Sequence, residues 1–128
     1  MTAMPPPTIG EFIKGPSHAV APDETIRAIA QILSSYEIGV VIVERDNEPV
    51  GVVSERDLVR GLTLHDEFGL VGSYLDMTAS DLMSSDPIVA DASTTKDDAV
   101  VMMRERELRH LLVATADGYG VVSIRDLL

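Results

Sequence analysis

The stretch Gly51-Val-Val-Ser-Glu-Arg-Asp57-Leu58 decides how the chain is organised, because it occurs twice. Sixty-nine residues later the chain reads Gly120-Val-Val-Ser-Ile-Arg-Asp126-Leu127, and seven of the eight positions are identical. A match of this length within 128 residues indicates an internal repeat. We therefore interpret the chain as two copies of one structural unit.

Each copy predicts a strand that leads directly into a helix. The paired valines follow other apolar residues, which favours a strand. Ser54 and Ser123 are placed as helix N-caps, with Asp57 and Asp126 at the third helical position. The glycine that begins each copy leaves room for another backbone segment to approach closely.

The regions around the two copies predict the order β-α-β-β-α twice. In the first, we expect a helical turn at 8–13, a strand at 19–20, a helix from 23–25 and antiparallel strands at 40–43 and 50–53. The counterparts in the second are 78–83, 88–89, a helix after residue 94, and strands at 111–113 and 119–122. Gly39 is expected to end the first long helix, and Thr94 with Asp97 to form a capping box.

These elements divide the chain into four parts. Residues 1–7 are a flexible Pro-rich arm, 8–60 the first repeat, 61–77 a connector and 78–128 the second repeat. The final helix of the second repeat is truncated relative to the first copy, so either the native chain ends there or the chain was cut. Apolar residues predict that the connector is partly helical and packed: Leu62, Leu64, Phe68, Leu70 and Leu75.

Composition excludes several classes of function. The net charge of −11 argues against nucleic acid and anionic membranes as main partners, since both require a basic face. No apolar run reaches membrane-spanning length, so we expect a soluble, cytoplasmic protein. The chain has no cysteine, and its three histidines, His18, His65 and His110, have no ligand spacing, so no metal site is predicted. No catalytic motif is found either.

The repeats resemble a tandem pair of CBS (cystathionine-beta-synthase) domains, the Bateman module. The resemblance is carried by the two Gly-apolar-apolar-Ser-x-x-Asp blocks, by Val20-x-x-x-x-Thr25 and by Leu108-Arg-His-Leu-Leu-Val113. It implies an α+β fold in which two β-α-β-β-α repeats pack as a pseudo-two-fold pair with clefts between them. In this family the clefts bind AMP, ADP, ATP, S-adenosylmethionine or dinucleotides, and the pairs commonly form homodimers.

The residues of the repeated block suit such a ligand. Asp57 and Asp126 offer carboxylate oxygens to the adjacent ribose hydroxyls, and Ser54 and Ser123 offer hydroxyl groups. Two arginines are candidate phosphate ligands: Arg56 and Arg125. A plainer interpretation is that Ser-x-x-Asp is a helix cap and that the arginines are solvated.

The base would lie against the backbone where the strands begin. The expected residues are His18, Gly39 and Val40 in the first half, and Pro87, Ile88, Arg109 and His110 in the second. Because the second half has more cationic side chains, we expect unequal sites, with anion binding near Arg109, His110, Arg125 and Asp126. His110 alternatively serves packing.

The sequence therefore predicts a regulatory module that binds adenosine-containing nucleotides and signals by a conformational or dimer change to an unidentified regulated protein. No cofactor is required, and AMP, ADP, ATP or S-adenosylmethionine are the expected ligands. One alternative is a dimerisation or partner-docking module that binds no nucleotide. The other is an enzyme, such as a weak nucleotide hydrolase.

Overall fold

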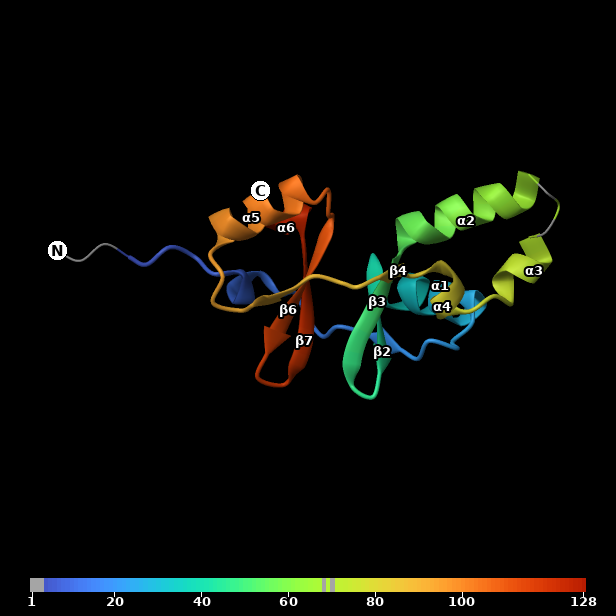
Figure 1. Ribbon diagram of the computed structural model, residues 1–128, viewed down its shortest axis with the longest axis horizontal. Coiled ribbons are helices and arrows are strands. Elements are labelled where there is room, and N and C mark those ends of the chain that lie inside the picture. Colours follow the sequence, from blue (N-terminus) through green and yellow to red (C-terminus); the bar gives the residue numbers. More distant parts are fainter. Residues whose placement is uncertain (1–3, 68, 70) are drawn as a thin grey trace. The chain divides into compact units, whose positions relative to one another are not determined.

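The computed structural model describes residues 4–67, 69 and 71–128, which form two compact units (Figure 1). One unit is His18–Pro87, which we call the first-repeat unit. The other combines Ile88–Leu128 with the residues up to Ser17, and we call it the second-repeat unit. Each unit has its own sheet and its own core.

The first-repeat unit is built on a four-stranded sheet in the order β1-β2-β3-β4. Strand β1 is parallel to β2, and the other pairs are antiparallel. The elements in chain order are β1 (Ala19–Val20), α1 (Ile26–Tyr36), β2 (Val40–Arg45), β3 (Glu48–Ser54), α2 (Glu55–Glu67), α3 (Val71–Leu75), α4 (Ala79–Leu82) and β4 (Ser84–Ser85).

The second-repeat unit repeats this plan on a three-stranded sheet in the order β5-β6-β7. Strands β5 and β6 are parallel, and β6 and β7 are antiparallel. The elements are η1 (Ile9–Phe12), β5 (Val89–Asp91), α5 (Lys96–Glu105), β6 (His110–Thr115), β7 (Gly118–Ser123) and α6 (Ile124–Leu127). The predicted order β-α-β-β-α is thus confirmed in both repeats.

The segment before each repeat completes the unit of the other repeat. Thr8 caps η1 and forms a β-bridge with Thr95, and the Ile9 N–H donates to Thr94 O at 2.9 Å. In the same way Thr78 caps α4 and forms a β-bridge with Thr25. The leading segments are therefore exchanged between the repeats.

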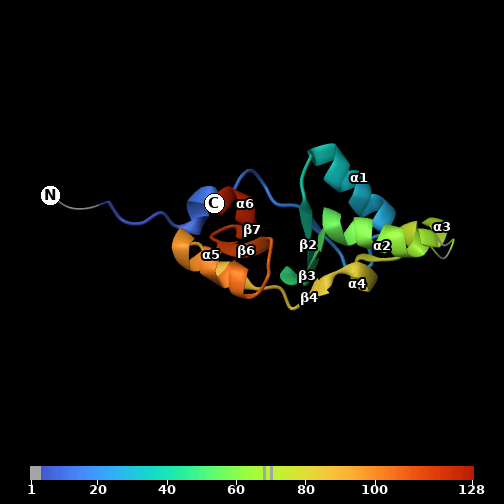
Figure 2. The ribbon, with the colours of Figure 1, turned by 90° about the horizontal axis from the view of Figure 1, so that it is seen from above.

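The core of each unit lies between its helices and one face of its sheet (Figures 1 and 2). Alternate strand residues point into it, as the period of two requires. The first core includes Ile29, Leu33, Val41, Val43 and Val53. The second includes Ala99, Met103, Leu111, Val113 and Val122. Among the described residues, the buried members of both cores are aliphatic side chains, with Met103 and Tyr74 in addition.

The repeated glycine makes room for the exchanged segment. The predicted close approach of another backbone segment is confirmed at Gly51, whereas at Gly120 the neighbouring atoms belong to a side chain. A Cβ atom on Gly51 would lie 2.8 Å from Ser84 O, because β4 pairs with β3 at this position. On Gly120 it would lie 2.7 Å from Ile13 Cδ1. A larger residue at either position would therefore collide with the segment that completes the unit.

Two predicted helix boundaries are wrong. The first long helix ends at Glu37, in the left-handed conformation with φ of 52°, so Gly39 is not its stop. The Ile38 N–H then donates to Leu33 O at 3.1 Å, as in a Schellman motif. Helix α5 is capped by Thr95 and not by Thr94. The backbone of Thr94 is held in a turn, since its N–H donates to Asp91 O and its C=O accepts from Ile9.

The connector is partly helical, as predicted, because α2 continues to Glu67 and α3 follows. The expected packing is wrong for Leu62 and Leu64, which are 41% and 53% exposed. Tyr74 packs in their place: it is 1% exposed and its ring lies over Gly61. Phe68 and Leu70 lie outside the described residues.

Candidate functional site

Asp57 is held at the start of α2 by a reciprocal capping box. The Ser54 N–H donates to Asp57 Oδ2 at 2.9 Å, and the Asp57 N–H donates to Ser54 Oγ at 3.1 Å. Both residues are half-buried. The cap therefore fixes the carboxylate, while the Ser54 hydroxyl keeps a proton to donate.

Gly39 and Val40 lie beside this cap. The Glu55 N–H donates to Gly39 O at 2.9 Å, and Val40 pairs with Ser54 in the β2–β3 ladder. The loop that enters β2 is thus joined to the first turn of α2. Two of the predicted base-binding residues and the predicted ribose-binding residues therefore lie together, where β2 begins and β3 ends.

His18 lies at the same end of the sheet, directly before β1. Its carbonyl accepts from the Ile42 N–H at 2.9 Å, and the next residue, Ala19, pairs with Ile42. The His18 ring packs against Tyr36 with 4.1 Å between ring centroids. Tyr36 is the last residue of α1, and the sequence did not predict this aromatic pair.

Asp126 occupies the equivalent place in the second-repeat unit. Its N–H donates to Ser123 Oγ at 3.2 Å, and its Oδ1 accepts from Lys14 Nζ at 2.9 Å. Lys14 is the largest cause of the lowered pKa of Asp126, and hydrogen bonds from Ser123 contribute. The Asp126 carboxylate is therefore an ionised acceptor at neutral pH.

Arg109 and His110 stand where Gly39 and Val40 stand in the first unit. The Ile124 N–H donates to Arg109 O at 2.8 Å, and His110 pairs with Ser123. Arg125 follows in the first turn of α6, and the side chains of Arg109 and Arg125 are exposed. The structure thus places the predicted cationic residues close to the capped aspartate.

The remaining predicted site residues, Ile88, Pro87 and Arg56, differ in how far they are buried. Ile88 packs against the second core, which leaves less of its side chain for a ligand. Pro87 is half-buried and belongs to the first-repeat unit. Arg56 is exposed on the first turn of α2.

Lys14 contacts the candidate site, and the sequence did not predict this contact. Lys14 is separated from Asp126 by 112 residues. The alignment of Thr8–Ile13 with residues 78–83 gives its repeat counterpart as Ser84, but gives no sign that the segment crosses to the other unit. The contact follows from the exchange of leading segments.

Tyr74 packs against α2 and is hydrogen-bonded to its first turn. Its hydroxyl donates to Leu58 O at 2.7 Å, and its ring stacks on His65 with 4.8 Å between centroids. Burial raises the pKa of the Tyr74 phenol, and the negative charge of Asp57 raises it further. The connector is therefore coupled to the first turn of α2.

Neither a metal-ligand cluster nor a membrane-spanning helix occurs in the described part of the chain. Among residues 4–67, 69 and 71–128, no group of three or more metal-ligating side chains gathers. Over the same residues no helix has both the length and the apolar character needed to cross a membrane.

Comparison with known proteins agrees with this architecture. The chain matches the family model described as CBS domain over residues 9–64 and again over 79–128. A CBS domain protein from Pyrobaculum aerophilum, complexed with AMP, is 30% identical, with a TM-score of 0.76 over 93% of this chain and 88% of that one. CBSX2 in complex with AMP is 28% identical, with a TM-score of 0.74 over 94% and 93% of the two chains.

Curated relatives are longer than this chain. An uncharacterized 17.7 kDa protein of Acidianus ambivalens is 30% identical over 113 residues, which are 86% of this chain and 64% of that protein. The chloroplastic CBS domain-containing protein CBSX1 of Arabidopsis thaliana is also 30% identical, over 87% of this chain and 57% of its own length. This chain thus spans less than two thirds of these relatives.

Proposed function

Because this chain belongs to the CBS domain family, we propose that it is a regulatory module that binds adenosine-containing nucleotides, with AMP the best-supported ligand. The observation that carries the proposal is the pair of capped aspartates, Asp57 and Asp126, each beside the loop that enters a central strand. The structures of two relatives that are 28% and 30% identical are complexes with AMP. Their similarity supports the same ligand class here.

The carboxylates bind the ribose in this proposal. The two ribose hydroxyls donate to the oxygens of Asp57 or Asp126, which the caps hold in a fixed orientation before the ligand arrives. A preorganised acceptor loses little rotational freedom on binding, so more of the interaction energy appears as affinity. Phosphate is bound by Arg56 in one site and by Arg125 in the other.

The strand entries bind the base. Backbone groups of Gly39–Val40 and Arg109–His110 lie next to the caps. In the first-repeat unit, the His18 and Tyr36 rings lie at the same end of the sheet as Gly39 and Val40. An aromatic face stacks on adenine, and arginine does so as well. We propose that the sites are unequal, with the stronger anion site at Arg109, His110, Arg125 and Asp126.

A thermal-shift panel tests the proposal. AMP, ADP, ATP, S-adenosylmethionine and GMP are each added to the wild type, to Asp57→Ala and to Asp126→Ala. A ligand at one hundred times its dissociation constant stabilises the folded state by about 2.7 kcal/mol. AMP should raise the melting temperature of the wild type, and each variant should lose part of the shift. If no adenine compound stabilises the wild type, the proposed function is wrong.

The two alternative functions predict different results with the same wild-type and variant proteins. A docking module without nucleotide binding shows no shift with any compound. A nucleotide hydrolase releases phosphate from ATP, and the release stops in Asp57→Ala or Asp126→Ala. We propose binding without turnover, so ATP should be recovered intact after incubation with the wild type.

An exposed apolar face favours homodimer formation as part of this function. Val59 and Leu62, three residues apart on one side of α2, are 61% and 41% exposed. Residues at this spacing form a common surface on a helix. We propose that a second copy of the chain covers this face and that ligand binding alters the pairing in order to signal to a regulated protein.

A further inference from the structure

Lys14 lies beside one of the two proposed ribose carboxylates, Asp126, and the residue that corresponds to Lys14 in the other repeat is an uncharged serine. Lys14 Nζ lies 2.9 Å from Asp126 Oδ1. The lysine side chain is 76% exposed and the aspartate side chain 23% exposed. The Lys14 ammonium group is therefore held by Asp126, while the aliphatic part of the side chain lies in solvent. The side chain can consequently change conformation when a ligand binds.

The counterpart of Lys14 beside the first-repeat unit is Ser84. Thr8 and Thr78 cap the corresponding short helices of the two exchanged segments. Five residues after each cap, Ile13 lies against Gly120 and Met83 lies against Gly51. The next residue in each segment is Lys14 or Ser84, so a lysine in one unit corresponds to an uncharged serine in the other.

The two sites consequently differ in local charge. The positive groups of the second-repeat site are Lys14, Arg109 and Arg125, against the single carboxylate of Asp126. At the cap of the first-repeat site, Arg56 stands with two carboxylates, Glu55 and Asp57. A doubly charged phosphate is therefore attracted more strongly by the first arrangement than by the second.

We infer that Lys14 is the residue that makes the Asp126 site selective for phosphorylated adenosines. This inference rests on the proposed function. One N–H of the ammonium group neutralises Asp126, and the other two remain for a phosphate oxygen. A ribose that donates to Asp126 leaves its 5′-phosphate within reach of the flexible lysine stem. Ser84 provides no such charge, so the preference for AMP over adenosine is weaker at the Asp57 site, where Arg56 is the proposed phosphate ligand.

The test is a site-resolved titration of the 15N-labelled chain with AMP and, separately, with adenosine. Backbone amides of residues 123–126 report on one site, and those of residues 54–57 on the other. In the wild type, the Asp126 site should bind AMP roughly tenfold more tightly than adenosine, equivalent to about 1.4 kcal/mol. Lys14→Met should remove most of this preference by weakening AMP, and Lys14→Arg should keep it. Ser84→Lys should strengthen the AMP preference at the Asp57 site.

The outcomes separate this inference from the proposed function. If Lys14→Met leaves the AMP-to-adenosine ratio unchanged, or weakens both ligands by the same factor, Lys14 has no part in phosphate selection. The dispersion of the amide spectrum shows whether each variant is folded. If neither ligand shifts any amide at either site of the wild type, the proposed function fails, and this inference fails with it.

Discussion

At the scale of single residues, the Lys14–Asp126 pair links stability to acid pH. The pKa of Asp126 is lowered in the folded state, so the pair stabilises the fold above the unfolded carboxyl pKa of about 4 and loses this effect as pH falls through the folded pKa. Because Lys14 is exposed, we expect Lys14→Met to cost less than about 1 kcal/mol at pH 7. Urea unfolding at several pH values should show the difference shrinking below pH 4, and Lys14→Arg should resemble the wild type. A difference that grows in acid would contradict the assignment.

Tyr74 gives a prediction at alkaline pH. Its phenol has a raised pKa, so the folded state retains the proton longer than the unfolded state, and stability falls as pH rises above about 10. Tyr74→Phe leaves Leu58 O without its donor and should cost about 1 kcal/mol at pH 7. The variant should also lose the part of the alkaline destabilisation that is due to Tyr74. Tyr36→Phe, at an exposed ring, is the matched control and should melt like the wild type.

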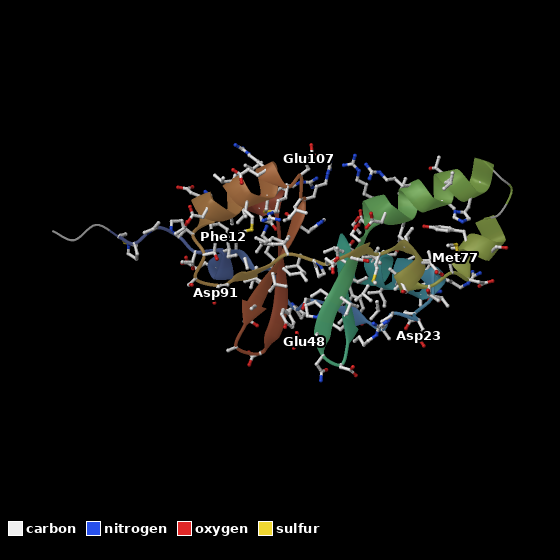
Figure 3. The ribbon with its side chains drawn as sticks, in the orientation of Figure 1. Phe12, Asp23, Glu48, Met77, Asp91 and Glu107 are labelled. Atoms are coloured by element: carbon white, nitrogen blue, oxygen red, sulfur yellow. The ribbon has the colours of Figure 1, made fainter. Side chains whose placement is uncertain are left out.

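At the scale of elements, the two long helices of the repeats end on strained glutamates. Glu37 and Glu107 have φ of 52° and 55°, and the residue after each donates back to the helix. Figure 3 labels Glu107 at the bend between α5 and β6. Since glycine adopts this conformation without steric cost, Glu37→Gly and Glu107→Gly should each stabilise the fold by roughly 0.5 kcal/mol. Chemical denaturation measures the change, and a loss of stability in both variants would show that the glutamate side chains contribute more than their backbone strain costs.

The paired glycines test the exchanged segments. Gly51→Ala meets the backbone oxygen of Ser84, whereas Gly120→Ala meets the flexible end of Ile13. Backbone in a sheet cannot move aside as a side chain does, so Gly51→Ala should cost about 1 kcal/mol more than Gly120→Ala. Thermal and urea unfolding of the two variants provide the comparison. Equal losses would mean that β4 moves away from β3 without cost.

Sequence alone predicted the elements that depend on neighbouring residues. The Ser54 and Ser123 caps and the two antiparallel strand pairs, β2–β3 and β6–β7, follow from local chemistry and a period of two, and the structure confirms them. The sequence did not predict the contact between Lys14 and Asp126, because these residues are 112 positions apart and meet only through an exchanged segment. The sequence also did not predict that Tyr74 packs over Gly61, while Leu62 and Leu64, which were expected to pack, are exposed. Contacts of this kind depend on how elements are placed, and no local pattern encodes them.

At the scale of the whole molecule, the proposed signal depends on association between copies. If α2 is the contact surface, Val59→Glu places a charge in an apolar interface and should shift the molar mass in light scattering from dimer to monomer. Val101→Glu is the matched control, because Val101 is 54% exposed on α5 and lies outside the proposed surface. If both variants or neither changes the mass, α2 does not form the dimer interface.

The most direct measurement is isothermal titration calorimetry with AMP on the wild type and on the double variant Asp57→Ala, Asp126→Ala. The two aspartates are the shared feature of the repeats and the basis of the proposed binding chemistry. We predict saturable heat with the wild type and none with a double variant that still unfolds cooperatively. An absence of binding by the wild type, or equal binding by the folded double variant, would contradict the claim that these carboxylates form adenine-nucleotide sites.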